Sequence, residues 1–201
     1  LDTEIDRRDF SWVRGSNRYL PLDIAVQWCQ RVPDDFHSRY SALGRRYVYL
    51  LLQSPVRPSL DAGRFGWTFR ELDGQAMRAA AALLVGEYDF TAFRSSECQA
   101  RTPVKNLREI RISRHGSCWR FDFEASAFLH HMVRNLMGSL LVVGEGRQSP
   151  GWMAEVLAAG MEYGALGGIV SGSGPTTAFL VENNEAGIDL AVALTASGVV
   201  R

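Results

Sequence analysis

The sequence predicts an α+β domain whose sheet is largely antiparallel, and three patterns carry this prediction. Residues 106–113 and 119–125 both alternate apolar and polar side chains, which is typical of half-buried strands. The segment Arg114–Ser117 between them contains a glycine and predicts a hairpin turn. Residues 73–85 and 127–143 instead repeat apolar residues at helical spacing. A hairpin flanked by amphipathic helices favours helices packed on an antiparallel sheet.

The N-terminal third contributes two further expected strands. Residues 1–17 are polar and charged, and Ile24–Trp28 then has the β-branched and aromatic side chains that favour a strand. Residues 46–52 are apolar and aromatic and predict a second strand. Two prolines in Ser54–Pro58 predict the turn that ends it.

Helices are expected on both sides of the hairpin, and one more is added to the two already described. The helix of residues 73–85 ends before Gly86, a residue that commonly follows a helix C-terminus. Its apolar positions are Met77, Ala80, Ala81 and Leu84. A short helix is expected at residues 151–158.

Length and composition indicate a globular chain. At 201 residues and 46% hydrophobic content, it can bury a substantial core. Its apolar runs, residues 79–85 and 136–143, are much shorter than the ~20 residues that span a bilayer. Three widely spaced cysteines, Cys29, Cys98 and Cys118, fit neither a disulfide framework nor a metal site, so we expect a reducing cytoplasm. Because the sequence begins at Leu1 and not at a methionine, we expect this start to be an internal position of a longer protein.

Charge is balanced overall but unevenly distributed. Residues 160–201 contain one basic side chain, Arg201, and four acidic ones, which leaves residues 1–159 mildly basic. Almost all the cations are arginines, which bind phosphate through two parallel hydrogen bonds. Genome composition explains an arginine excess equally well, so charge alone does not establish a nucleic-acid partner.

The segment Phe128–Leu140 is the most informative in the chain. If it is helical, His130, His131 and Arg134 lie three or four residues apart and share one side of an otherwise apolar helix. An arginine in such a run neutralises a buried carboxylate or holds a phosphate, because an unpaired buried guanidinium is costly. The alternative is an arginine that extends its head group to solvent from the edge of a packed helix.

Four segments, in this order and at these spacings, resemble the TruA-type tRNA pseudouridine synthases. The resemblance covers residues 1–158, about four fifths of the chain, and lacks the first half of that family. These segments are Val32–Arg39, Ala42–Tyr49, Leu84–Arg94 and Phe128–Gly138. The resemblance implies half of a pseudouridine synthase fold and an isomerase that detaches uracil from its ribose and rejoins it through carbon 5, without metal or cofactor. The target base must leave its stack to be reached.

Two catalytic residues follow from this resemblance. Arg134 matches the family arginine that pairs with a nucleophilic aspartate and keeps it ionised. That aspartate lies in a Gly-Arg-Thr-Asp-type motif that this chain lacks, so we expect the chain alone to be inactive. Tyr47 matches the tyrosine that stacks on the target base, and only the resemblance separates it from Tyr49, which faces the same side of the strand. Without the resemblance, the sequence is equally compatible with Tyr47 being a tyrosine packed in the core.

The remaining candidate residues would bind tRNA. Arginine suits phosphate contacts, although for any single residue a solvated surface position explains it as well. The two neighbouring histidines and His37 can pair with phosphate or can simply pack, and no metal-ligand spacing links them. The candidates for substrate binding are Tyr47, Arg39, Arg45, Arg46, Arg94, Arg101, His37, His130 and His131. The resemblance also implies a homodimer.

The C-terminal tail differs in composition from the rest. Eight of the 19 glycines fall in residues 160–201. The run Gly164–Thr176 resembles the third motif of the GHMP small-molecule kinases, most like the diphosphocytidyl-methylerythritol kinases. A glycine-rich turn between two strands is the alternative. We therefore expect a synthase half at residues 1–159 and a kinase-like fragment at 160–201, with few contacts between them.

Three functions are compatible with these patterns. The leading one is an incomplete tRNA pseudouridine synthase that acts on uridines in the anticodon stem-loop region. The second is a catalytically dead RNA-binding module, which salt-dependent tRNA binding without turnover would support. The third, a GHMP-type kinase, requires an ATP-binding glycine loop that is absent from this sequence.

Overall fold

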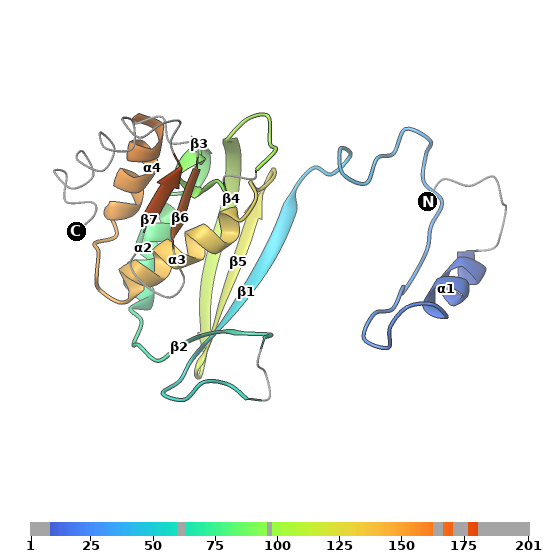
Figure 1. Cartoon of the computed structure of the whole chain (residues 1–201), viewed down its shortest axis with the longest axis horizontal. Coiled ribbons are helices and arrows are strands. Elements are labelled where there is room, and N and C mark those ends of the chain that lie inside the picture. The colour runs from blue at the N-terminus through green and yellow to red at the C-terminus, as the bar shows by residue number, and fades with distance from the viewer. Residues whose placement is uncertain (1–8, 60–62, 96–97, 163–166, 171–176, 181–201) are drawn as a thin grey trace. The chain divides into compact units, whose positions relative to one another are not determined.

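The structure is a computed structural model of the chain and describes all residues except 1–8, 60–62, 96–97, 163–166, 171–176 and 181–201 (Figure 1). The chain divides into two compact units, residues 1–42 and residues 43–201.

Among its described residues, 9–42, the first unit contains one helix, α1, at Asp9–Asn17. The side-chain amide of Asn17 donates to the Val26 carbonyl at 2.9 Å and accepts from the Val26 amide at 2.7 Å, which holds the following chain against the end of the helix. The expected strand at Ile24–Trp28 is not formed. Ile24 and Trp28 are 55% and 73% exposed, and the described residues supply no neighbouring strand for this segment.

The second unit is built on a five-stranded sheet. Its strands are β1 (Arg45–Gln53), β2 (Gly66–Thr68), β3 (Gly86–Asp89), β4 (Val104–His115) and β5 (Cys118–Ala125). Their spatial order is β2-β1-β5-β4-β3, and only the β1–β2 pair is parallel. The class is α+β as predicted, and the sheet is mixed but largely antiparallel, because three of its four strand pairs are antiparallel.

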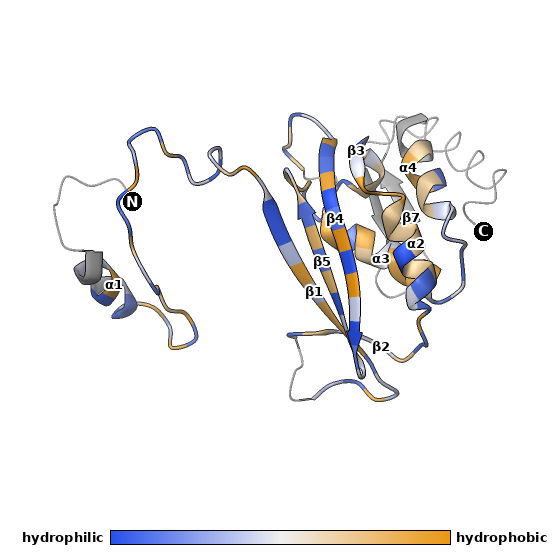
Figure 2. Ribbon diagram, turned by 180° about the vertical axis from the view of Figure 1, so that it is seen from behind, coloured by the Kyte–Doolittle hydropathy of each residue, from blue (hydrophilic) through white to orange (hydrophobic). Residues whose placement is uncertain are grey.

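The central β4–β5 hairpin is confirmed. Its strands pair antiparallel from His115–Cys118 back to Leu107–Ala125, with one irregularity after Leu107. Gly116 begins the connecting turn at φ 57°, a left-handed conformation that glycine adopts at low cost. The alternation that predicted the strands is visible as colour bands along β4 in Figure 2.

Three α-helices cover one face of this sheet, as the opposite views in Figures 1 and 2 show. They are α2 (Gly74–Ala82), α3 (Met132–Gly144) and α4 (Trp152–Glu162). Asp73 caps α2, because its carboxylate accepts from the backbone amides of Gln75 and Ala76. The short 3-10 helix η1 (Thr91–Phe93) follows β3.

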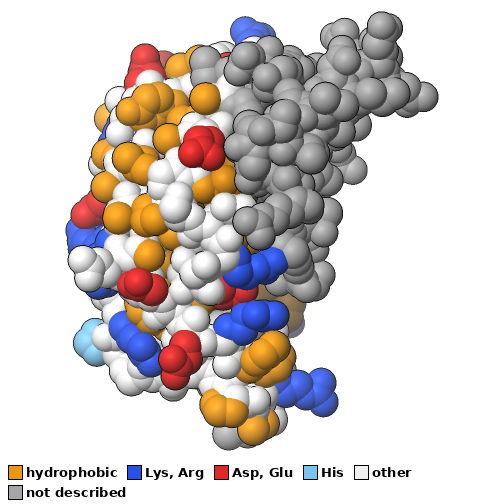
Figure 3. Space-filling model, turned by 90° about the vertical axis from the view of Figure 1, so that its left-hand side faces the viewer, with side chains coloured by type: hydrophobic (Ala, Val, Ile, Leu, Met, Phe, Trp, Pro, Cys, Tyr) orange, Lys and Arg blue, Asp and Glu red, His pale blue; other side chains and the backbone are white. Residues whose placement is uncertain are grey.

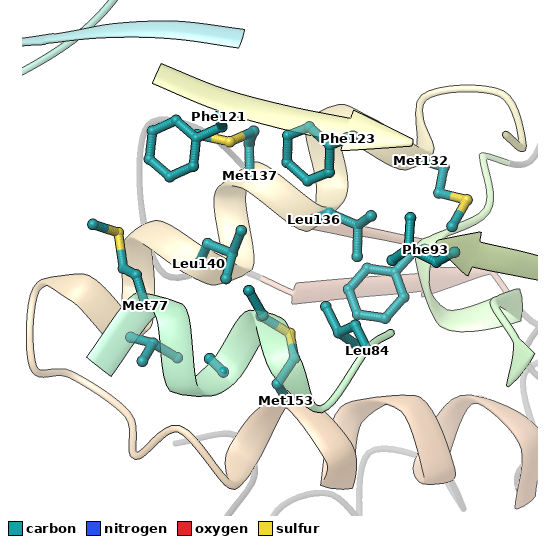
Figure 4. Packing of buried hydrophobic residues seen from close by; sticks show 14 of the residues in the cluster. Met77, Leu84, Phe93, Phe121, Phe123, Met132, Leu136, Met137, Leu140 and Met153 are labelled. Atoms are coloured by element: carbon teal, nitrogen blue, oxygen red, sulfur yellow. The ribbon is translucent and has the colours of Figure 1, made fainter. Parts of the chain in front are cut away.

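The core lies between the sheet and these helices (Figure 4). Phe121 and Phe123 point from β5 toward α3, where Leu136, Met137 and Leu140 are almost fully buried. Each such side chain contributes about 1.5–3 kcal/mol by leaving water. This packing fixes α3 against β5 and therefore positions the residues at the beginning of α3.

Two tail strands are described, β6 (Gly167–Val170) and β7 (Thr177–Leu180). They pair antiparallel in a separate two-stranded sheet and make no ladder with the five described strands of the main sheet. The β6 backbone nevertheless lies beside η1 and α3, which differs from the expectation of few contacts with the preceding chain. The glycine-rich run between the two strands lies outside the described residues. No helix among the described residues has the length and apolar character needed to span a membrane.

Candidate functional site

The candidate site lies where β1 begins and β5 ends, on the face that carries the helices. Tyr47 pairs directly with Phe123, so both side chains point to this face. The Tyr47 ring is 49% exposed and meets Phe128 edge-on, with 5.2 Å between ring centroids. Tyr49 points the same way but is less exposed and packs against the core. The structure therefore gives Tyr47 the free ring surface that base stacking needs.

The turn before α3 carries the two histidines. The helix begins at Met132, so the predicted helix over residues 127–143 was too long, and His130 and His131 precede it. Their rings stack with 4.0 Å between centroids. His131 has φ 60°, which costs roughly 1–2 kcal/mol for a residue with a Cβ. Surrounding contacts must hold such a conformation, and it is often found at functional sites.

Those contacts come from the segment that follows η1. The His130 amide donates to the Cys98 sulfur at 3.3 Å, and the His130 carbonyl accepts from the Ser95 amide at 3.1 Å. One turn into α3, the buried Asn135 side chain donates to the Phe93 carbonyl at 3.0 Å. Three hydrogen bonds thus tie His130 and the first turn of α3 to the end of η1 and the segment that follows it.

Arg94 supports the same segment from within. Its guanidinium donates to the carbonyls of Cys98 at 2.7 Å and Ala100 at 3.1 Å. Burial would raise the pKa of the Cys98 thiol, but backbone hydrogen bonds from His130 and Ala100, together with the Arg94 charge, hold that pKa below its usual value. Arg94 is therefore engaged in holding this loop in the described structure.

Arg134 occupies the first turn of α3, and its side chain is exposed. The side chain makes no hydrogen bond or ion pair with any residue the structure describes. The helix packs its opposite side, Leu136 and Leu140, into the core. Arg134 can therefore accept an acidic or phosphate partner from outside these residues.

Arg46 lies on the other face of the sheet. Strand alternation turns it away from Tyr47, and its guanidinium donates to Asp122 at 2.9 Å. Arg120 binds the same carboxylate with two hydrogen bonds of 2.8 Å. The hydrogen bonds from Arg120, followed by those from Arg46, outweigh burial and lower the pKa of Asp122 to about 2. This carboxylate is structural, and Arg46 does not join Tyr47 in one site.

We expect Asp122 to make the chain sensitive to acid between about pH 4 and pH 2. Its pKa falls from 3.8 to about 2 on folding, so the stabilisation is complete above pH 4 and is lost as pH falls to 2. Solvent screens the half-exposed arginines, which limits the contribution to about 1–2 kcal/mol. Urea unfolding should show a shallower acid limb in Asp122→Asn than in the parent chain. Glu109→Gln, which removes an exposed ion pair, is the control, and an equally steep limb in Asp122→Asn would contradict this assignment.

The remaining predicted residues are distributed differently. His37 and Arg39 belong to the first unit, where the His37 ring accepts from the Arg39 and Tyr40 amides and packs at a tilt against the Tyr40 ring. Arg45 begins β1 on the same face as Tyr47, and Arg101 is exposed beyond the Arg94 segment. In the second unit, the structure thus brings Arg45 and Tyr47 to the end of the sheet from which the histidine turn and α3 continue.

Sequence reasoning overlooked three residues of this site. Phe128, which contacts Tyr47, was read only as part of the motif. Cys98 and Asn135 hold the histidine turn from two sides. Asn135 had a detectable signal, because a polar amide in an apolar helical run requires a buried hydrogen-bond partner.

Comparisons with known proteins agree with the resemblance. Residues 80–167 match a family described as tRNA pseudouridine synthase. The chain is 70% identical over 160 residues to tRNA pseudouridine synthase A of Methylibium petroleiphilum, covering 80% of the chain and 62% of that relative. It is 65% identical over 163 residues to tRNA pseudouridine synthase A of Variovorax paradoxus, covering 79% of the chain and 60% of the relative.

The chain thus spans about three fifths of the length of these curated relatives. The matched region includes η1, the hairpin, the histidine turn and α3. These comparisons confirm the resemblance of this chain to the TruA-type tRNA pseudouridine synthases.

Proposed function

We propose that this chain supplies the tyrosine and arginine side of a tRNA pseudouridine synthase active site. The carrying observation is the placement of an exposed Tyr47 ring on Phe128, at the end of the sheet from which α3 and the exposed Arg134 continue. The family match and the identity to named synthases support uridine in tRNA as the substrate. The resemblance implies the anticodon stem-loop region and a homodimer, and the spacing of the three cysteines favours a cytoplasmic setting; all three belong to this proposal.

The proposed chemistry divides between binding and charge. The target uridine leaves its stack, and the Tyr47 ring receives the base. Arg134 pairs with a nucleophilic aspartate that the described residues do not supply, and this ion pair keeps the carboxylate charged. The fixed histidine turn holds the start of α3, and with it the backbone of Arg134, in place.

The described aspartates of the second unit all have other partners, which favours a second candidate function for the chain by itself. Asp73 caps α2, Asp89 accepts from the Thr91 amide, and Asp122 binds two arginines. None of these is free to attack a nucleoside. A chain that keeps the Tyr47 side of the cleft without a nucleophile would be an RNA-binding module.

We therefore expect this chain alone to bind tRNA without converting it. The measurement is tritium release from tRNA labelled at uridine carbon 5. It is made in parallel on this chain and on the whole synthase, meaning the full-length protein. The whole protein should release tritium, and the 201-residue chain should remain at the no-protein blank. If the chain releases tritium and either Asp34→Asn or Asp89→Asn abolishes that release, the assignment of the missing nucleophile is refuted. No release by the whole protein would refute the proposed function.

A separate origin for residues 160–201 also remains our proposal. Its support is the glycine-rich composition and the GHMP-kinase resemblance of Gly164–Thr176. The expected boundary at residue 159 falls within α4, which runs to Glu162. Sequencing the gene continuously across codons 155–165 decides the question, because an uninterrupted synthase reading frame in the source DNA would remove the chimera.

A further inference from the structure

Two aromatic side chains, one on the edge strand β2 and one just after it, are exposed. Trp67 is 40% exposed and Phe69 is 62% exposed, and their ring centroids are 6.0 Å apart. The Trp67 indole donates to the Ser54 carbonyl at 2.9 Å, which fixes the orientation of its ring. Figure 3 shows hydrophobic and basic side chains together at the lower end of the molecule. Rigid exposed rings lose little entropy on binding, so this surface is suited to a ligand.

One arginine lies over one of these rings, and two more are exposed on the loop that precedes them. The Arg70 guanidinium lies 5.4 Å from the centre of the Phe69 ring, and Arg57 and Arg64 are exposed on the loop that joins β1 to β2. Neither of these two forms an ion pair with the residues the structure describes. The one carboxylate paired with Arg70 is Glu145, at 3.6 Å, and it is shared with Arg147 at 3.5 Å. The surface therefore combines apolar rings with an excess of positive charge, although Glu71 is exposed beside it.

We propose that this surface, the β2 patch of Arg57, Arg64, Trp67, Phe69 and Arg70, binds an unpaired nucleotide of the RNA substrate. A base stacks on the exposed rings, and the flanking phosphates pair with Arg57 and Arg64. This chemistry favours RNA over a protein partner, because every nucleotide supplies one flat ring and one negative charge. The proposal rests on RNA as the substrate and adds a contact site to it.

The patch is distinct from the candidate active site. Trp67 pairs with Leu52 near the far end of β1, five residues from Tyr47. At about 3.3 Å per residue, this places the two sites roughly 17 Å apart along the strand. Strand alternation puts Leu52 and Trp67 on the face of the sheet opposite Tyr47, so an RNA that contacts both sites passes around the edge strand β2. The patch would then position the substrate without touching the reacting uridine.

The test measures binding of the 201-residue chain to two probes, a fluorescein-labelled ten-nucleotide oligouridine and an unmodified tRNA transcript, at several salt concentrations. Phe69→Ala should weaken binding of both about tenfold, because each stacked base typically contributes that much. Phe69→Tyr should restore it. Arg57→Gln and Arg64→Gln should each lower affinity and reduce the salt slope by about one.

The matched controls are Tyr88→Ala, which removes an exposed aromatic from β3, and Arg108→Gln, which removes a half-exposed arginine from β4. Both should leave binding unchanged, and circular dichroism should match the parent chain in every variant. Equal binding by Phe69→Ala and Tyr88→Ala would overturn the proposal. So would a Phe69→Ala variant that changes sedimentation but not RNA affinity, because the patch would then be a self-association surface. Oligouridine binding tests the patch independently of tritium release, so the patch and the proposed activity can fail separately.

Discussion

In the whole synthase, Arg134→Ala is expected to slow pseudouridine formation at least a hundredfold while leaving tRNA affinity within a factor of about three. Arg134 is exposed at the start of α3 and makes no described ion pair, so its partner in the proposed site is the nucleophilic carboxylate. Removing one member of a buried charge pair typically costs about 3–5 kcal/mol, most of it in the chemical step here. Single-turnover tritium release and filter binding measure the two quantities separately.

Two variants sharpen this prediction. Arg134→Lys keeps the charge but loses the two-pronged hydrogen bond, so its rate should fall between those of the parent and the alanine variant. Arg111→Ala removes an exposed arginine of β4 that pairs with Glu109, and it should change neither rate nor affinity. A parallel loss of rate and tRNA affinity in Arg134→Ala would mean that this arginine binds phosphate instead.

Asn135→Ala is expected to lower the free energy of unfolding by about 3 kcal/mol. The Asn135 side chain is 3% exposed and donates to the Phe93 carbonyl at 3.0 Å, so its loss leaves a buried acceptor without this donor and creates a small cavity. For a chain of this length the melting temperature should fall by roughly 6–12 °C. Urea unfolding and calorimetry give the two values.

Ser139→Ala is the matched control on the same buried face of α3. Its hydroxyl donates to the Asn135 carbonyl at 3.2 Å within the helix, so its removal breaks a bond without leaving a distant partner unpaired. We expect a cost below about 1 kcal/mol. If Ser139→Ala and Asn135→Ala cost the same, the bond to Phe93 is not what stabilises the start of α3.

Much of the fold follows from local patterns, and the hairpin shows why. Alternation in β4 and β5, with Gly116 between them, determines strands, turn and exposed face together. Helix α2 could likewise be predicted from local sequence, because Asp73 caps it. In contrast, β2 has only three residues and forms by pairing with β1. The local sequence does not predict this pairing.

The same limit explains the errors in the site. The apolar spacing of α3 continues backward through Phe128, so periodicity extended the helix over a turn that tertiary hydrogen bonds impose. The apolar run around Arg134 indicated an anionic partner, but its role beside an aspartate, and the choice of Tyr47 over Tyr49, came from the family resemblance. The segment of Ile24 had strand-like side chains but no described partner, and propensity alone did not produce a strand.

The position of β1 between β2 and β5 has a consequence for folding kinetics. The hairpin closes through a short turn, which takes about 1–10 μs in isolated hairpins. β1 pairs Leu52 with Cys118 and Arg45 with Ala125, so roughly 65–80 residues must form a loop before any of these pairs exists. The sheet is therefore expected to assemble outward from the hairpin, with β1 joining after the helices have packed. Tyr47 would reach Phe128 only in that late step, so collapsed chains that already contain the helices would still lack the ring surface of the site.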